Sequence, residues 1–204
     1  MSTEEKPLQV VIIGEGSVGK SSLCLMFVKG EFNIEYNPTI EETYPTEVNV
    51  DGKVVKMSIV DTAGQEEYVS LRDQFYVKGD AFILVYSIDN LNSFHSLNIH
   101  YETIAGLRKG KKMAVVLVGN KCDLEAQRAI QKSDLQQLSE KFNNAPYYET
   151  SAQNNINVKE VFETIARETL KNAAEEAATQ TKTIQSNHPS QVTESERGGC
   201  CYIL

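Results

Sequence analysis

Short apolar runs alternate with amphipathic stretches along most of the chain. The alternation predicts strands over residues 8–13, 41–50, 54–60, 81–87, 113–119 and 147–150. Apolar positions at three- and four-residue steps predict helices over residues 21–28, 93–109, 133–143 and 157–170. Strands that alternate with helices form right-handed βαβ units, which build a mostly parallel sheet with helices on both faces.

One strand pair departs from this parallel arrangement. Asp51-Gly52 separates two alternating segments and is a turn sequence typical of β-hairpins. Pro45 in the first segment indicates an edge strand, because proline donates no hydrogen bond to a sheet ladder. We therefore expect an α/β fold of three layers, with a mostly parallel six-stranded sheet, one antiparallel edge strand and helices on both faces.

Composition and charge narrow the class of protein. The chain has 204 residues, with 28 acidic and 20 basic side chains and a formal net charge of −8. This length suits one domain with some chain to spare, and the acidic balance disfavours nucleic-acid binding. No apolar run reaches the roughly 18–20 residues that span a bilayer, and the N-terminal residues lack the pattern of a signal peptide. We expect an intracellular, soluble and monomeric protein.

The chain divides near residue 172. Leu170 is the last large apolar residue of the final predicted helix, and residues 179–199 are rich in Thr, Gln and Ser. We predict a folded domain over residues 1–172, a flexible linker over 173–199 and a separate terminal segment over 200–204. Four of the acids and two of the bases lie beyond residue 172, which leaves 24 acids, 18 bases and a net charge of −6 for residues 1–172.

A glycine-rich loop follows the first predicted strand. Residues 14–21, Gly-Glu-Gly-Ser-Val-Gly-Lys-Ser, match the phosphate-loop (P-loop) pattern between a strand and a helix. The backbone N–H groups of such a loop surround a β-phosphate, Lys20 bridges the β- and γ-phosphates, and the Ser21 hydroxyl binds Mg²⁺. The alternative is a chance glycine-rich turn. The motif indicates a P-loop version of the three-layer fold, whose ligands bind at the carboxyl ends of the strands.

Three further motifs follow predicted strands in order. Asp61 ends a strand and suits either direct coordination of the metal or contact through water, while Gly64 allows close approach to a γ-phosphate and Gln65 is placed to orient a water. In Asn120-Lys121-Cys122-Asp123, the carboxylate of Asp123 accepts both N–H groups of a guanine edge, whereas adenine offers no matching donor pair. Ser151-Ala152 offers backbone N–H groups to the guanine O6.

On these motifs the sequence closely resembles the Ras family of small GTPases, over roughly residues 6–172. The matching segments are residues 14–21, 36–41, 61–68, 120–123 and 150–152. The resemblance implies that Thr39 closes on Mg²⁺ and the γ-phosphate, that Phe32 packs on the guanine, and that residues 31–44 and 62–80 are two nucleotide-dependent switches. It implies catalytic roles for Lys20, Thr39, Gly64 and Gln65, and metal contacts from Ser21, Thr39 and, through water, Asp61. The nucleotide contacts that it implies come from Gly16, Ser17, Val18, Gly19, Lys20, Ser21, Ser22, Phe32, Tyr36, Pro38, Thr39, Gly64, Asn120, Lys121, Asp123, Ser151, Ala152 and Gln153.

The sequence departs from the family pattern at a few positions. Ser17 stands where Ras proteins have a second glycine, and Gln153 stands where a lysine usually covers the base; both are expected to be tolerated. Gly16 and Gln65 match Ras proper, whereas Rheb has arginine at the first position and Rap usually has threonine at the second. We therefore favour Ras proper. Asn37 and Glu42 are conservative differences in the loop that faces partners.

The predicted activity is slow GTP hydrolysis. Phosphoryl transfer needs positioning and charge neutralisation, and the first arginine of the chain, Arg72, lies beyond the P-loop and the first switch. Arg72, Arg108, Arg128 and Arg167 are interpreted as surface or helix charges. We expect an arginine supplied by a GTPase-activating protein to accelerate turnover. Two alternatives stay open: a phosphotransferase that uses ATP through the same loop, and a nucleotide-binding scaffold without hydrolysis.

An acidic stretch lies between Lys29 and Lys53, where Glu occupies positions 31, 35, 41, 42 and 47 with no base among them. It forms either a solvated acidic edge or, over residues 35–47, an effector surface that pairs with a basic edge strand of a partner. We expect effectors to bind in the GTP state, because the γ-phosphate orders the first switch. A guanine nucleotide exchange factor is the third expected partner.

The chain ends in two cysteines. Cys201-Tyr202-Ile203-Leu204 fits the prenylation box, and the final Leu favours geranylgeranyl; the alternatives are a chance cysteine pair or a disulfide, which a reducing compartment disfavours. One lipid anchors only marginally, so Cys200 is a candidate for palmitoylation. These features predict a lipidation signal over residues 200–204 and a location on the cytoplasmic face of the plasma membrane or an endomembrane. Lipid must hold the protein there, because its net negative charge opposes an anionic surface.

Overall fold

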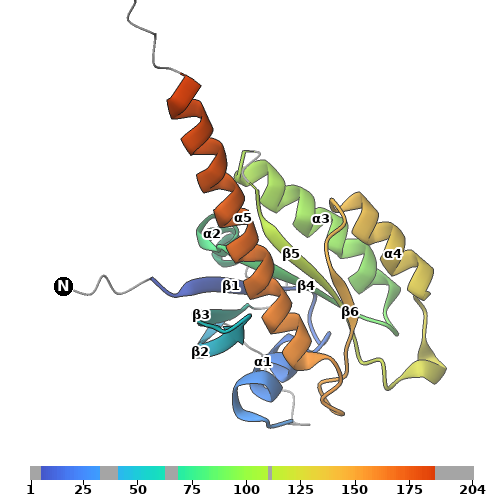
Figure 1. Ribbon diagram of the computed structural model, residues 1–204. Coiled ribbons are helices and arrows are strands. Elements are labelled where there is room, and N and C mark those ends of the chain that lie inside the picture. Colours follow the sequence, from blue (N-terminus) through green and yellow to red (C-terminus); the bar gives the residue numbers. More distant parts are fainter. Residues whose placement is uncertain (1–5, 33–40, 63–68, 110–111, 187–204) are drawn as a thin grey trace, which may run out of the picture. The chain divides into compact units, whose positions relative to one another are not determined.

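The computed structural model describes residues 6–32, 41–62, 69–109 and 112–186. Residues 1–172 and 173–204 form separate compact units, and each is considered by itself. The strands are β1 (Leu8–Ile13), β2 (Glu41–Val50), β3 (Lys53–Thr62), β4 (Ala81–Ser87), β5 (Ala114–Asn120) and β6 (Tyr147–Glu149). The helices are α1 (Lys20–Lys29), α2 (Val69–Lys78), α3 (Leu91–Leu107), α4 (Lys132–Lys141), α5 (Val158–Ser186) and the short 3-10 helix η2 (Glu125–Gln127) (Figure 1).

The six strands form one sheet in the order β2-β3-β1-β4-β5-β6. β1 runs parallel to β3 and β4, β5 runs parallel to β4 and β6, and β2 is antiparallel to β3. The β2–β3 turn places Asp51 at φ 51° and Gly52 at φ 85°, the left-handed conformations that a two-residue hairpin turn requires. The predicted sheet is confirmed, and Pro45 lies on its edge strand as expected.

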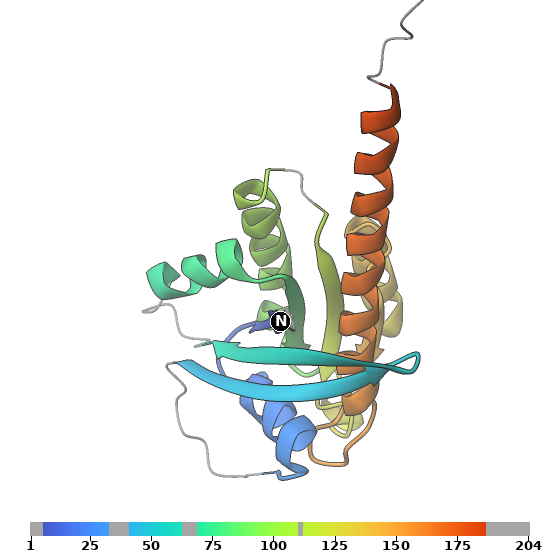
Figure 2. The ribbon, with the colours of Figure 1, turned by 60° about the vertical axis from the view of Figure 1, so that its left-hand side comes forward.

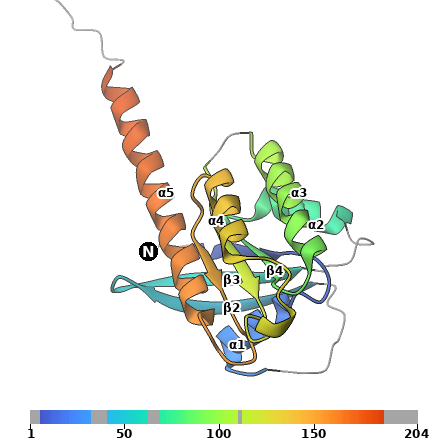
Figure 3. The ribbon, with the colours of Figure 1, turned by 90° about the vertical axis from the view of Figure 1, so that its right-hand side faces the viewer.

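Helices cover both faces of the sheet (Figures 2 and 3), and the buried apolar residues form a separate cluster on each face. Val10 and Ile12 of β1 belong to the core that α1 and α5 close, whereas Val11 and Ile13 belong to the core that α2, α3 and α4 close. This follows from the alternation of side chains along a strand. Every residue of β4 and β5 is buried. The three-layer arrangement predicted from the apolar runs is therefore confirmed.

The sequence predicts no helix where α2 lies. Its described side chains place Tyr76 in the core, while Val77 next to it is 61 % exposed. The apolar positions of this segment in the sequence, 69, 71, 75, 76 and 77, do not recur regularly at three- and four-residue steps, so the periodic signal that predicts the other helices is missing.

α5 continues past the predicted end at residue 170 and reaches Ser186. Residues 173–186 are thus helical, which differs from the flexible linker predicted there. Residues 173–178 are exposed, so burial does not explain the extension. Ala, Glu, Gln and Lys favour helix, and an existing helix grows without the cost of a new nucleus. In the described part of the chain, no helix is both long and apolar enough to cross a membrane.

Candidate functional site

The P-loop connects β1 to α1, and close neighbours require glycine at two of its positions. A Cβ atom at Gly14 would lie 2.1 Å from the carbonyl oxygen of Val85 in β4. A Cβ atom at Gly19, which has φ +94°, would lie 2.3 Å from the side-chain nitrogen of Asn120. The loop is therefore pressed against the carboxyl ends of β4 and β5, where the fold is expected to bind ligands.

Lys20 is the first residue of α1, and its side chain turns back into the loop. The Nζ atom donates hydrogen bonds to the carbonyl oxygens of Gly14, at 3.0 Å, and Glu15, at 2.7 Å. The residue is 6 % exposed, and a buried ammonium needs such partners. The structure thus holds the cation inside the loop, where the motif predicts the phosphates.

The N-terminus of α1 carries no negative side chain. Gly19 caps the helix in the left-handed conformation, and within the described residues no side chain caps the helix and none in the first turn is acidic. The half-buried Ser21 and Ser22 lie in this turn. The first N–H groups and the helix dipole therefore attract an anion at this end. A phosphate group suits the position.

Asp61 and Ser21 are the described residues that suit a metal ion. Asp61 is fully buried near the end of β3, opposite Ile12 of β1, and the neighbouring Thr62 Oγ1 donates a 2.8 Å hydrogen bond to the Ile12 carbonyl oxygen. Burial, and then the negative charge of Asp61, raise the pKa of the Cys24 thiol, so the carboxylate acts on the α1 side of the sheet. Carboxylate and hydroxyl oxygens are ligands that Mg²⁺ prefers, and Mg²⁺ usually takes its remaining ligands from phosphates and water.

Asn120 joins three loops at the end of β5. Its side-chain nitrogen donates a 2.9 Å hydrogen bond to the carbonyl oxygen of Val18 in the P-loop. Its side-chain oxygen accepts a 3.0 Å hydrogen bond from Thr150 Oγ1, just after β6. The residue is 2 % exposed. Both of its polar atoms are thus used within the protein, so Asn120 positions the predicted nucleotide loops rather than facing solvent.

Asp123 and Ser151 meet at the predicted guanine edge. The hydroxyl of Ser151 donates a hydrogen bond to a carboxylate oxygen of Asp123 and accepts one from the Asn154 N–H at 3.1 Å. The backbone N–H of Ser151 donates to the Ile156 carbonyl oxygen at 3.2 Å. This leaves Ala152, which is buried, as the member of the Ser151-Ala152 pair whose N–H donates to no described residue.

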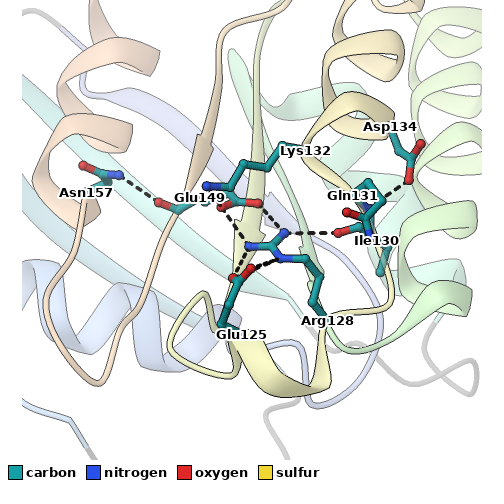
Figure 4. A network of polar contacts seen from close by, with 8 residues as sticks. All are labelled: Glu125, Arg128, Ile130, Gln131, Lys132, Asp134, Glu149 and Asn157. Atoms are coloured by element: carbon teal, nitrogen blue, oxygen red, sulfur yellow. Dashed lines mark hydrogen bonds and ion pairs between the residues drawn. The ribbon is translucent and has the colours of Figure 1, made fainter.

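A half-buried ion pair connects the segment after η2 to β6, beside these loops, and the sequence does not predict it (Figure 4). Arg128 follows η2 and donates to both carboxylate oxygens of Glu149 in β6, at 2.6 Å and 3.0 Å, and to the exposed Glu125. Its side chain is only 8 % exposed, so its interpretation as a surface or helix charge is wrong. The hydrogen bonds that Arg128 donates to Glu125 and Glu149 raise the pKa of Arg128 further above its usual value. The one signal in the sequence for this link to β6 is that Arg128 lies five residues after Asp123.

Several predicted site residues lie outside the described residues. These are Tyr36, Pro38, Thr39, Gly64 and Gln65, together with Cys200 and Cys201. Phe32 is described and is 37 % exposed. Gly16, Ser17, Lys121 and Gln153 lie in the loops described above, with Ser17 at φ 62° and Lys121 at φ 63°. Burial, with the charges of Asp123 and Glu149, raises the pKa of the Cys122 thiol.

Fold and site together define a P-loop α/β protein whose P-loop, 120–123 and 150–152 motifs gather at the carboxyl ends of the strands. Comparison with known proteins narrows this class. The family model described as the Ras family matches residues 9–171. The chain therefore belongs to the Ras family of small GTPases.

Individual relatives agree with this assignment. Ras-like protein 1 of Saccharomyces cerevisiae is 43 % identical over 159 residues, which is 78 % of this chain and 51 % of the yeast protein. Ras-like protein rasB of Dictyostelium discoideum is 36 % identical and covers 96 % of both chains. Ras-like protein 2 of Mucor circinelloides is 33 % identical and covers 98 % of this chain and 96 % of its own length. The chain thus spans about half the length of the yeast relative and nearly the whole of the other two.

Proposed function

We propose that this chain binds GTP and GDP with Mg²⁺, hydrolyses GTP slowly and acts as a membrane-anchored molecular switch. The observation that carries the proposal is the buried side chain of Asn120. It joins the P-loop to the 120–123 and 150–152 loops through partners 102 and 30 residues away in the sequence. Membership of the Ras family supports the same reaction class.

Guanine recognition rests on Asp123 and Ala152. The Asp123 carboxylate accepts the two N–H groups of the guanine edge, and its hydrogen bond from Ser151 fixes its orientation. Because the Ser151 N–H already donates to Ile156, the N–H of Ala152 is the donor for the guanine O6. An adenine base would leave the carboxylate facing an acceptor, a mismatch that strongly lowers affinity.

Hydrolysis follows from positioning and charge. Lys20 moves from the Gly14 and Glu15 carbonyl oxygens to neutralise the β- and γ-phosphate oxygens, and the α1 N-terminus adds positive potential. Ser21 and Thr39 would hold Mg²⁺, with Asp61 acting through water, and the ion would supply positive charge beside the phosphate oxygens. Gln65 orients the attacking water and Gly64 allows the backbone to approach the γ-phosphate. An arginine from a GTPase-activating protein supplies the charge that the P-loop and first switch lack.

The switch also needs partner proteins and a membrane anchor. Effectors with a basic edge strand dock on residues 35–47 in the GTP state, and the described part of this region supports it, because β2 is an edge strand with exposed Glu41, Glu42 and Glu47. An exchange factor reloads the site. Geranylgeranyl on Cys201 and palmitoyl on Cys200 anchor the chain to the cytoplasmic face of the plasma membrane or an endomembrane.

Single-turnover hydrolysis of GTP, with and without a Ras-type activating protein, tests the proposal. We expect slow hydrolysis alone and a stimulation of roughly 10³–10⁵, the range that an added arginine gives to this class of enzyme, Ras proteins included. Gln65→Leu should remove the stimulation, whereas Gln127→Leu on the exposed surface of η2 should keep it. Rapid hydrolysis without a partner would refute the dependence on an external arginine. Equal competition by ATP would favour the phosphotransferase alternative.

The switch and the anchor are tested separately. Effector affinity should fall as salt is added and collapse when GDP replaces GTP; equal binding to both forms would refute the switch. Mass spectrometry of the protein from native membranes should find the lipid on Cys201, and an unmodified thiol there would refute the anchor.

A further inference from the structure

A cluster of bases lies at the amino-terminal edge of the sheet, away from the P-loop. Its members come from four separate segments: Lys6 precedes β1, Lys78 ends α2, Arg108 and Lys109 follow α3, and Lys112 precedes β5. We call these five residues the basic pole. All of its lysines are exposed, and Arg108 is half-buried.

Hydrogen bonds and strand register bring these segments together around the turn at Gly79-Asp80. Asp80 is tied to β1, because its N–H donates to the Gln9 carbonyl oxygen and its carboxylate accepts from the Gln9 N–H, both at 2.9 Å. Arg108 donates to the Gly79 carbonyl oxygen, with its guanidinium 5.4 Å from the centre of the Phe82 ring. Ala81 pairs with Ala114 across β4 and β5, so Lys112 lies beside the same turn.

The charge of this pole is opposite to that of the rest of the unit. Asp80 is the one acid within residues 6–9, 78–81, 106–109 and 112–114, against five bases. The rest of residues 1–172 then holds 23 acids against 13 bases. Lys6, Lys78 and Lys109 form no ion pair with any residue that the structure describes. Their charges are therefore available to an outside partner.

We propose that the basic pole is a docking surface for anionic lipid headgroups, which orients the unit with its nucleotide loops away from the membrane. Each basic residue near an anionic leaflet adds attraction that decays within a Debye length. At about 0.1 M salt that length is about 10 Å. Salt therefore screens the repulsion between the membrane and distant acids of the unit, but it weakens the attraction of the basic pole much less because the pole touches the membrane. Binding to the membrane therefore depends on where the charges lie on the unit, and not on its net charge.

The choice of a membrane rather than an acidic protein as the partner of the basic pole rests on the proposed function. A lipid on Cys201 would hold the unit at high effective concentration beside a membrane, so even a weak electrostatic surface would be used. The four lysines of the pole are long, exposed side chains from separate segments. Such an arrangement suits a surface of many anionic headgroups rather than the regular hydrogen-bonding pattern of one partner strand.

Vesicle binding by the full chain without lipid modification tests the surface itself. Vesicles of phosphatidylcholine, with or without about 30 mol % phosphatidylserine, are sedimented at about 0.1 M salt. We expect at least tenfold tighter binding to the anionic vesicles, and loss of that preference in the double variant Lys78→Glu and Lys109→Glu. The double variant Lys29→Glu and Lys159→Glu makes the same charge change on α1 and α5, which cover the other face, and should keep most of the preference.

Orientation gives a second readout, because the chain contains no tryptophan. Leu107→Trp places a probe on an exposed residue next to the pole, and Ile156→Trp places one on an exposed residue after β6. Energy transfer to a dansyl lipid should be stronger from position 107, and the difference should vanish when Lys78 and Lys109 are reversed. Equal transfer from both probes, or no preference for anionic vesicles, overturns the proposal; binding to polyglutamate but not to vesicles would assign the pole to an acidic protein. An unmodified Cys201 in cells would refute the anchor and leave these vesicle results unchanged.

Discussion

At the scale of single residues, the site depends on polar atoms that are satisfied inside the protein. Asn120 holds the Val18 carbonyl oxygen and the Thr150 hydroxyl at once, and it is almost fully buried. A buried polar group that loses its partner costs about 1–3 kcal/mol. Removing one side chain would therefore strand two groups on different loops.

Asn120→Ala should lower the free energy of unfolding by about 2–4 kcal/mol and speed the release of bound GDP, because the P-loop and the 150–152 loop lose their link. Urea unfolding and the dissociation of a fluorescent GDP analogue would measure the two effects. Asn154→Ala changes an exposed residue of the neighbouring turn. It should leave the free energy of unfolding within about 0.5 kcal/mol of wild type and the rate of GDP release close to that of wild type. If the two variants unfold and release GDP alike, Asn120 does not hold these loops together.

Gly19 and Gly30 give a matched pair for the effect of crowding. Both have left-handed backbones, at φ +94° and +68°, but only a Cβ atom at Gly19 would meet a neighbour, the Asn120 amide at 2.3 Å. Gly30→Ala should cost only the backbone penalty of about 1–2 kcal/mol. Gly19→Ala should cost more and also weaken GDP binding, as measured by calorimetry. A similar loss in the free energy of unfolding at both positions would show that the P-loop moves to accommodate the added Cβ atom.

Sequence alone locates the motifs at this scale but not their mutual contacts. The P-loop glycines, Lys20 and Asp123 are predictable because the chemistry of each depends on neighbours a few positions away. Asn120 is predicted as a nucleotide contact, yet its partners are Val18 and Thr150, which only the folded sheet brings together. Arg128 is misjudged for the same reason: nothing local distinguishes an arginine that reaches Glu149 from one that faces water.

At the scale of elements, the Arg128–Glu149 pair ties the segment after η2 to β6. Arg128→Met would leave Glu149, whose side chain is 17 % exposed, with Lys132 at 3.6 Å as its remaining cation among the described residues. We expect a loss of about 1–3 kcal/mol in the free energy of unfolding, since removing one partner of a half-buried pair leaves a poorly paired charge, and faster GDP release. Denaturant unfolding with a nucleotide release assay would check both. Unchanged GDP release would show that β6 keeps its place without the pair.

Glu125→Gln is the control for this pair, because Glu125 is the exposed partner of Arg128. It should change stability little. The hydrogen bond from Arg128 holds the pKa of Glu125 below its usual value, so its contribution is present at neutral pH and is lost as the pH falls through the lowered value. The small difference between wild type and this variant should therefore shrink in acid.

The extension of α5 shows why helix ends are hard to predict from burial patterns. The pattern of large apolar residues ends at Leu170 and predicts the helix to end there, although the residues that follow favour helix on their own. Ala178→Pro should break this extension, because proline removes a helical hydrogen bond at a cost of about 3 kcal/mol. Circular dichroism should lose helical signal while the unfolding temperature of residues 1–172 stays constant. Ala178→Glu should keep the signal; a similar loss in both variants would contradict the argument.

At the scale of the whole molecule, a bound nucleotide links the loops that the fold gathers at one edge of its sheet. A ligand that binds only the folded state stabilises it by about 1.4 kcal/mol for each tenfold rise in free ligand above the dissociation constant. For a domain of this size, that corresponds to roughly 3–6 °C in unfolding temperature. GDP with Mg²⁺ should therefore raise the unfolding temperature steadily with concentration, and chelation of Mg²⁺ should reduce the rise. ADP offers the same two phosphates but the wrong base edge for Asp123, so it should give little shift at the same concentrations. An equal shift from ADP would mean that the phosphates alone account for binding, and guanine specificity would then have to be removed from the proposed function.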